Sequence, residues 1–137
     1  MSPLRTVITG SVRYRGREGQ LAFILHRLSG LGTLLFLALH ILDTSTVYFF
    51  PDLYKEALAL YRHPLFMLGE IFLVAAVIYH GANGLRIALF DLFPRLWRAE
   101  REKPSVYTTL AVTVVLWLPA AFIMGRSLIG RTFLGWE

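Results

Sequence analysis

Three stretches without charged residues constrain this chain more than any other feature of its sequence. Residues 28–42, 71–85 and 104–125 contain no Asp, Glu, Lys or Arg. The third stretch can cross a bilayer by itself, because a transmembrane helix needs about 20 apolar residues. The first two reach that length only if the charged residues at their ends lie near the interfaces or face the protein interior. We therefore predict an all-α membrane protein with three transmembrane helices.

Prolines and polar residues set the expected limits of these helices. The predicted transmembrane helices cover residues 21–49, 65–93 and 105–124. Residues 52–62 have the pattern of a short amphipathic helix between the first two spans. We expect the chain to have three parts, which are a basic arm (1–20), a transmembrane domain (21–125) and an outer tail (126–137).

Basic residues predict the orientation of the chain. The arm carries four arginines and one acid, namely Arg5, Arg13, Arg15, Arg17 and Glu18. The segment between the prolines at positions 94 and 104 is also net basic. Because cytoplasmic segments of membrane proteins are enriched in Lys and Arg, we predict an N-in, C-out protein of the cell inner membrane. The formal charge of +5 then reflects orientation, and we expect no nucleic acid partner.

Metal chemistry in this chain must use nitrogen or oxygen, because the chain contains no cysteine to hold an iron–sulfur cluster. His80 lies on one face of the second predicted helix, at helical spacing from the small residues Ala76 and Gly84. Small residues leave room for a flat cofactor such as haem. They also mark simple helix contacts, in which the histidine is only hydrogen-bonded to a neighbour. The pattern by itself leaves both interpretations open.

The first predicted helix carries two further histidines of interest. His40 is deep in the span, and Asp43 and Thr44, one turn later, are expected to orient its ring. The alternative is a seam of hydrogen bonds between helices. His26 is followed by Arg27 at the membrane edge, and this pair suits an anionic or polar group such as a haem propionate or a quinone carbonyl.

The two deep histidines cannot share one iron. Helical rise places His40 about 20 Å from the level of Arg27, and His80 about 9 Å from the level of Arg86. Metal–imidazole bonds are only about 2 Å long. Since His63 lies in the predicted outer loop, a haem with two histidine ligands must take one of them from a partner subunit.

Two motifs resemble a known family. The run from His80 to Asp91 has the spacing H-x3-G-x-R-x4-D and resembles the haem-binding helix of the cytochrome b556 subunit of succinate dehydrogenase. The run from His26 to Gly30, His-Arg-Leu-Ser-Gly, resembles the quinone-proximal motif of the same family. The resemblance covers about residues 15–125. At position 23 this chain has Phe where some members have a serine that helps to bind quinone.

The resemblance implies roles for individual residues. His80 is expected to ligate the iron of a haem b near the cytoplasmic side, and His26 to approach its propionates. Arg27 is expected near the quinone, and the cofactor-binding set also includes Ser29 and Arg86. A further residue, His40, resembles the first-helix histidine of members with two haems, so a second haem iron is expected there.

The resemblance also implies a function in electron transport. In this family a flavoprotein subunit oxidises succinate in the tricarboxylic acid cycle, an iron–sulfur subunit passes the electrons on, and membrane subunits host haem and quinone. This chain is expected to form half of a helical bundle in the lipid bilayer. A second membrane anchor subunit would complete the bundle and supply the other axial histidines. The chain has no succinate-oxidising site, and the quinone is ubiquinone or menaquinone. The alternatives are a haem-free structural anchor and the anchor of a fumarate reductase.

Overall fold

The structure is a computed structural model that describes residues 18–135, and this part of the chain is almost entirely helical. The elements are α2 (Glu18–Phe49), α3 (Pro51–Tyr61), α4 (Pro64–Leu92), the 3-10 helix η1 (Pro94–Leu96) and α5 (Ala99–Phe133). Helices α2, α4 and α5 are long and apolar enough to cross a membrane. The predicted all-α, three-span fold is confirmed. Residues 1–17 of the predicted basic arm lie outside the described residues.

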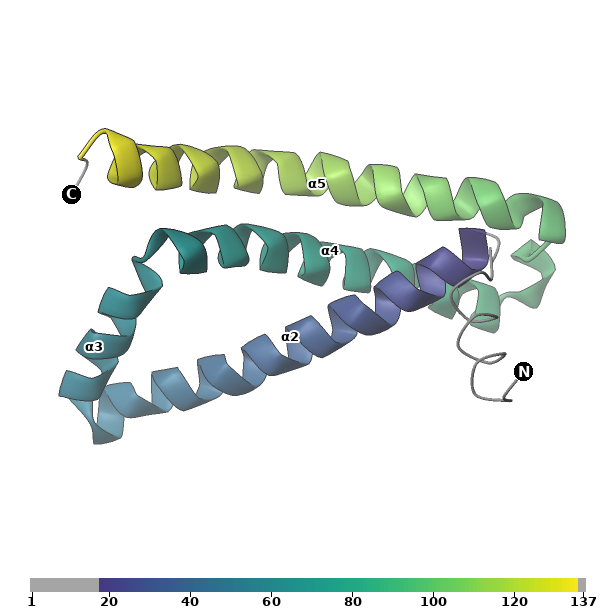
Figure 1. Ribbon diagram of the computed structural model, residues 1–137. Helices are drawn as coiled ribbons and strands as arrows, with labels where there is room; N and C mark the ends of the chain where they lie inside the picture. Colours follow the sequence, from purple (N-terminus) through teal and green to yellow (C-terminus); the bar gives the residue numbers. More distant parts are fainter. Residues whose placement is uncertain (1–17, 136–137) are drawn as a thin grey trace, which may run out of the picture.

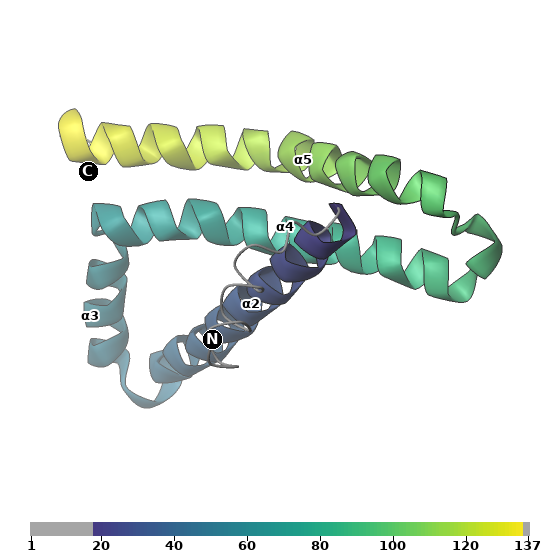
Figure 2. The same ribbon diagram turned by 45° about the vertical axis from the view of Figure 1, so that its right-hand side comes forward.

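The three long helices run back and forth between two ends of the molecule (Figure 1). The start of α2 and the connection from α4 to α5 lie at one end, and α3 lies with the end of α5 at the other. The same arrangement is seen after a turn of the view, where α2 crosses α4 at an angle while α5 follows α4 (Figure 2). An ion pair of 3.1 Å between Lys103 and Glu18 joins the starts of α5 and α2.

Prolines that the sequence predicts as breaks between helices are the first residues of the second and third helical elements. Pro51 and Pro64 occupy the first turns of α3 and α4, where a missing N–H has no intrahelical partner to lose. At the start of α4 the ring of His63 accepts a hydrogen bond of 3.3 Å from the backbone N–H of Leu65. His63 therefore caps a helix and stands apart from the histidines of the spans.

The third transmembrane helix is longer at both ends than the predicted 105–124, so these bounds were wrong. Helix α5 begins at Ala99 and contains Pro104, which was expected to precede it. Residues 99–103 are good helix formers with acids in the first turn, and a proline this close to the start removes only one hydrogen bond. The helix also continues to Phe133, with Arg131 in its last turn, because nothing beyond Pro119 breaks it. Most of the predicted outer tail is therefore helical.

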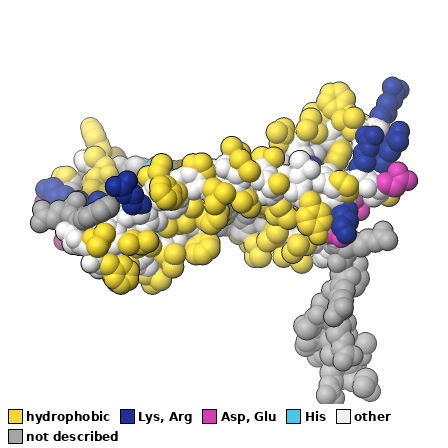
Figure 3. Space-filling model, turned by 90° about the horizontal axis from the view of Figure 1, so that it is seen from above, with side chains coloured by type: hydrophobic (Ala, Val, Ile, Leu, Met, Phe, Trp, Pro, Cys, Tyr) yellow, Lys and Arg dark blue, Asp and Glu magenta, His cyan; other side chains and the backbone are white. Residues whose placement is uncertain are grey.

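The surface of the described chain is suited to lipid. Hydrophobic side chains cover the middle of the face shown in Figure 3, whereas Lys, Arg, Asp and Glu gather toward the two ends. The buried apolar residues are few: Ala22, Ile71, Tyr79 and Val106. Large residues such as Leu31 and Val115, which are 65% and 66% exposed, cover the outside of the spans. In a bilayer this pattern carries no penalty, because lipid chains are as apolar as the side chains.

Polar contacts hold α4 against α5. The Trp117 indole N–H donates to the backbone carbonyl of Ile71 at 2.9 Å, and Arg86 Nη1 donates to Ser105 Oγ at 3.3 Å. Thr109 and Thr113 are buried, but their hydroxyls donate to carbonyls of their own helix. These contacts fix the side of α4 that faces α5 and leave another side to face α2.

Candidate functional site

Two imidazole rings meet where α2 crosses α4. The rings of His26 on α2 and His80 on α4 lie parallel, with centroids 4.2 Å apart and planes at 5°. The two histidines come from separate motifs that the sequence placed on different helices. The structure brings them into direct contact.

Glycines make this contact possible in a reciprocal way. The ring of His80 lies against Gly30, where an added Cβ would be 2.8 Å from His80 Cε1. The ring of His26 lies against Gly84, where an added Cβ would be 3.6 Å from His26 Cε1. The signal is present in the sequence, because both helices carry histidine and glycine at the spacing H-x3-G. Since α2 and α4 run in opposite directions, each imidazole covers the glycine of the other helix.

A hydrogen bond fixes the tautomer of His80. Its Nδ1 lies 3.2 Å from the backbone carbonyl oxygen of His26. A carbonyl only accepts, so Nδ1 carries the proton and donates it. The Nε2 atom of His80 then keeps its lone pair, which is the state in which histidine ligates a metal. The same carbonyl accepts a 3.0 Å hydrogen bond from the hydroxyl of Ser29, which is buried.

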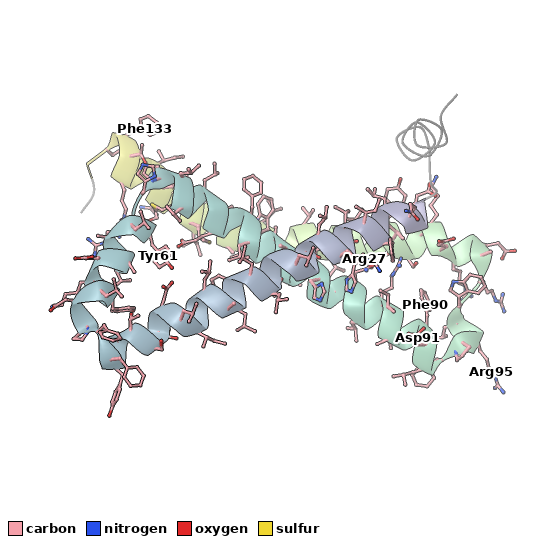
Figure 4. All side chains as sticks on the ribbon, turned by 60° about the horizontal axis from the view of Figure 1, so that its bottom comes forward. Arg27, Tyr61, Phe90, Asp91, Arg95 and Phe133 are labelled. Carbon is pink, nitrogen blue, oxygen red and sulfur yellow. The ribbon has the colours of Figure 1, made fainter. Side chains whose placement is uncertain are left out.

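The predicted arginines lie on different sides of the histidine pair. Arg27 is exposed on α2, close to the crossing of α2 and α4 (Figure 4). Its guanidinium stacks over the ring of Phe23 at 4.4 Å from the centroid, a cation–π contact through which the phenylalanine supports the arginine. Arg86 instead faces inward, where Nη1 donates to Ser105 of α5.

His40 lies well away from this pair, in a pocket of about 720 Å³ between α2, α3 and α4. Apolar side chains such as Leu35, Leu39, Leu58 and Leu73 line most of it. Its polar lining residues are His40, Asp43, Thr44, Tyr54, Tyr61 and Glu70. The His40 ring packs on Phe36 with centroids 5.4 Å apart. The sequence placed His40 and His80 at different depths, and in the structure His80 does not line this pocket.

The expected partners of the His40 ring are engaged elsewhere, so that prediction was wrong. The Asp43 carboxylate accepts a hydrogen bond from the Tyr61 hydroxyl of α3. The Thr44 hydroxyl donates at 2.6 Å to the backbone carbonyl of His40, not to its ring. A threonine inside a helix commonly bonds the carbonyl four residues earlier. Tyr61 was missed because its contact spans two helices whose angle the sequence does not give.

No group of three or more His, Asp or Glu side chains within residues 18–135 is arranged to hold a metal ion. A single histidine such as His80 is the kind of ligand used by a group that brings its own equatorial ligands and takes only axial ones from the protein.

Comparison with known proteins decides the family. Residues 3–120 match the family of succinate dehydrogenase/fumarate reductase transmembrane subunits. The chain belongs to this family. It is 35% identical over 112 residues to the membrane subunit SdhC of succinate dehydrogenase 2 from Mycobacterium tuberculosis, a match that covers 82% of this chain and 81% of that protein. The chain is thus a multi-pass membrane anchor subunit of the succinate dehydrogenase/fumarate reductase family, and it works in a complex with other subunits.

Membership in this family agrees with the resemblance found in the sequence, and the structure shows how the residues of the two motifs are arranged. The two motifs of this anchor subunit form one site at the crossing of α2 and α4, with His26, Ser29 and His80 in contact through a single backbone carbonyl. Of the two arginines near that site, Arg27 is exposed, and Arg86 is partly buried and bonded to Ser105 of α5. His40 belongs to a separate pocket.

Proposed function

We propose that this anchor subunit binds haem b through Nε2 of His80 and passes electrons from an iron–sulfur subunit to membrane quinone in a succinate dehydrogenase. The observation that carries the proposal is the hydrogen bond from His80 Nδ1 to the His26 carbonyl. That bond orients the ring and leaves Nε2 able to ligate iron. Because Gly30 has no side chain, the His80 ring can lie directly against α2 in this orientation.

Haem supplies a one-electron carrier when it is bound, and the chain supplies the setting that tunes it. His80 would hold the iron of a bound haem, and a second membrane anchor subunit would supply a further histidine ligand and complete the helical bundle. His26 and Arg27 present N–H groups at the same end of the bundle, which suits propionate carboxylates. The flavoprotein subunit carries out the succinate chemistry, which this chain does not perform.

Quinone binding is proposed beside Arg27, the exposed cation of the site. The buried Ser29 hydroxyl donates to the His26 carbonyl. Ser29 therefore contributes to the site indirectly, through the carbonyl that also bonds His80. The Arg27 guanidinium is held over the Phe23 ring and is exposed, so a quinone carbonyl can accept hydrogen bonds from its N–H groups. Ubiquinone and menaquinone share this carbonyl chemistry.

A second haem is proposed at His40. The pocket of about 720 Å³ that His40 lines falls within the usual range for ligand sites, about 300–1,000 Å³, and its walls are largely apolar. Because the Asp43 carboxylate is bound to Tyr61, the His40 ring has no carboxylate orienting it from that residue. A second axial histidine at this level would again come from the other anchor subunit.

The orientation proposed for the complex follows from charge. The starts of α2 and α5 and the η1 segment form the end that carries the basic residues Arg95, Arg98, Arg101 and Lys103. We place this end at the cytoplasmic face of the inner membrane, where the soluble subunits dock, and α3 at the outer face.

The deciding experiment is optical spectroscopy of the purified complex. We expect a reduced-minus-oxidised b-type band that disappears in His80→Ala and persists in His63→Ala, since His63 only caps α4. A haem count of two per complex that falls to one in His40→Ala would support the second haem. Absence of a b-type band in the wild-type complex would refute haem binding and support the alternative of a haem-free structural anchor. The direction of the reaction is tested by measuring the rate of succinate oxidation with a quinone and the rate of fumarate reduction with a quinol.

A further inference from the structure

A group of buried polar atoms without partners lies beside the histidine pair. The side-chain amide of Asn83 is only 1% exposed, and neither its nitrogen nor its oxygen has a hydrogen-bond partner within the described chain. The same holds for His26 Nδ1 and for Arg86 Nε, both of which are also buried. In a membrane, where no solvent replaces the missing bonds, each such group costs on the order of several kcal/mol.

These atoms belong to one place in the fold, the junction of α2, α4 and α5. Tyr79, Asn83 and Arg86 are four and three residues apart, so they lie along one face of α4. At one end of this face Tyr79 donates to the carbonyl of Ala22 on α2 at 3.1 Å. At its other end Arg86 donates to Ser105 on α5. Asn83 lies between them, where the three helices meet.

His26 reaches the same junction from α2. It follows Ala22 by one helical turn, and its Cε1 atom faces the Cβ position of Gly84, the residue next to Asn83. Its ring stacks on His80, and its Nδ1 atom is buried. The unpaired atoms of α2 and α4 therefore share one interior region.

The burial of Asn83 limits what can bind there. The amide is closed off by this chain alone, so a side chain of a partner subunit or a haem propionate has no path to it. A partner subunit would only bury it further. Water is small enough to be enclosed, and buried waters commonly make about three hydrogen bonds to polar groups that lack other partners.

We propose that the junction of α2, α4 and α5 holds at least one internal water bound by Asn83, Arg86 and His26. In the arrangement that satisfies these atoms, Arg86 Nε donates to the water oxygen. The water donates its two protons to Asn83 Oδ1 and to His26 Nδ1. Asn83 Nδ2 donates to a second water of the same site.

The water sets the tautomer of His26. With Nδ1 accepting, the proton of the neutral ring is on Nε2. His80 has the opposite tautomer, because its Nδ1 donates to a carbonyl. The stacked pair then offers an N–H donor on one ring and a lone pair on the other. That His26 Nε2–H donates to a bound cofactor rests on the proposed function, whereas the water and the tautomer do not. Asn83 is thus a positioning residue that acts through His26.

The first test is a cryo-EM map of the intact wild-type complex at a resolution that shows ordered water. We expect a water peak within about 2.7–3.2 Å of the Asn83 amide and of either His26 Nδ1 or Arg86 Nε. A map in which the Asn83 amide bonds directly to a side chain or to haem, with no water between, overturns the proposal. This map needs no variant, so a variant that fails to fold does not affect it.

The second test is nitrogen-15 solid-state NMR of the complex with labelled histidine. The His26 signal is assigned by its loss in His26→Gln, and in wild type we expect the Nε2–H tautomer. In Asn83→Leu, which has similar size but no hydrogen bonds, we expect this signal to shift toward the other tautomer or a mixture. Thr113→Val is the matched control, because this buried hydroxyl bonds only within α5, and it should leave the signal unchanged. A wild-type His26 with the proton on Nδ1, or an Asn83→Leu spectrum identical to wild type, overturns the tautomer assignment.

The two proposals fail separately. A missing b-type band would refute haem binding and leave the water site intact. A dry junction in a complex with a normal b-type band would refute the water site and leave haem binding intact.

Discussion

Replacing Gly30 by alanine tests haem binding through the space around the ligand, with His80 itself unchanged. A Cβ at position 30 would lie 2.8 Å from Cε1 and 3.1 Å from Nδ1 of His80. Carbon atoms prefer separations of about 3.5–4.0 Å. The ring would therefore have to move by roughly 0.5–1 Å, away from the position in which Nδ1 bonds the His26 carbonyl.

The size of the effect follows from this overlap. Overpacking of an interior site costs about 1–3 kcal/mol. Since about 1.4 kcal/mol is a factor of ten in affinity, we expect roughly 5- to 150-fold weaker haem binding in Gly30→Ala. The measurement is haem content per complex by pyridine haemochrome, together with the rate of haem transfer to an excess of apomyoglobin.

Gly125→Ala is the matched control for this experiment. Gly125 is on α5 and does not line the His40 pocket, and a Cβ there would meet no atom within 4 Å in the described part of the chain. Alanine is also a better helix former than glycine by about 1 kcal/mol, so the control should retain haem and lose no stability. Normal haem retention in Gly30→Ala, or an equal loss in both variants, would refute the reasoning.

Three further outcomes are expected from the structure. Gly84→Ala should weaken haem binding less than Gly30→Ala does, because its Cβ would make an ordinary contact of 3.6 Å with His26; a stronger effect in the haem transfer assay would contradict this geometry. Tyr61→Phe should lower the free energy of unfolding of the complex by about 1–3 kcal/mol, since it leaves the Asp43 carboxylate without its donor. An unchanged melting curve would argue against that bond. Because the chain has no cysteine, single introduced cysteines can report its orientation. Glu56→Cys on α3 should react with an impermeant maleimide added outside intact cells, and Glu100→Cys should react only after lysis. The reverse pattern would exclude the N-in orientation.

Periodicity and composition alone determined the helices of this anchor subunit. The three charge-free stretches became three helices, because a backbone in lipid must satisfy its own hydrogen bonds and a helix does so locally. Pro51 and Pro64 marked the boundaries between helices, although the structure makes each the first residue of the following helix and not a break before it. Pro104 misled the prediction, because a proline near the start of a helix is tolerated when the residues before it favour helix.

The partners of the site residues were decided only by tertiary structure. His26 and His80 each carry H-x3-G in the sequence, but their stacking depends on the crossing of α2 over α4. Asp43 was expected to serve His40 and instead binds Tyr61, which a turn between two helices brings within reach. Spacing along one helix gives the face on which a side chain lies. Which residue it meets depends on the angle and register between helices, and many packed side chains set these together.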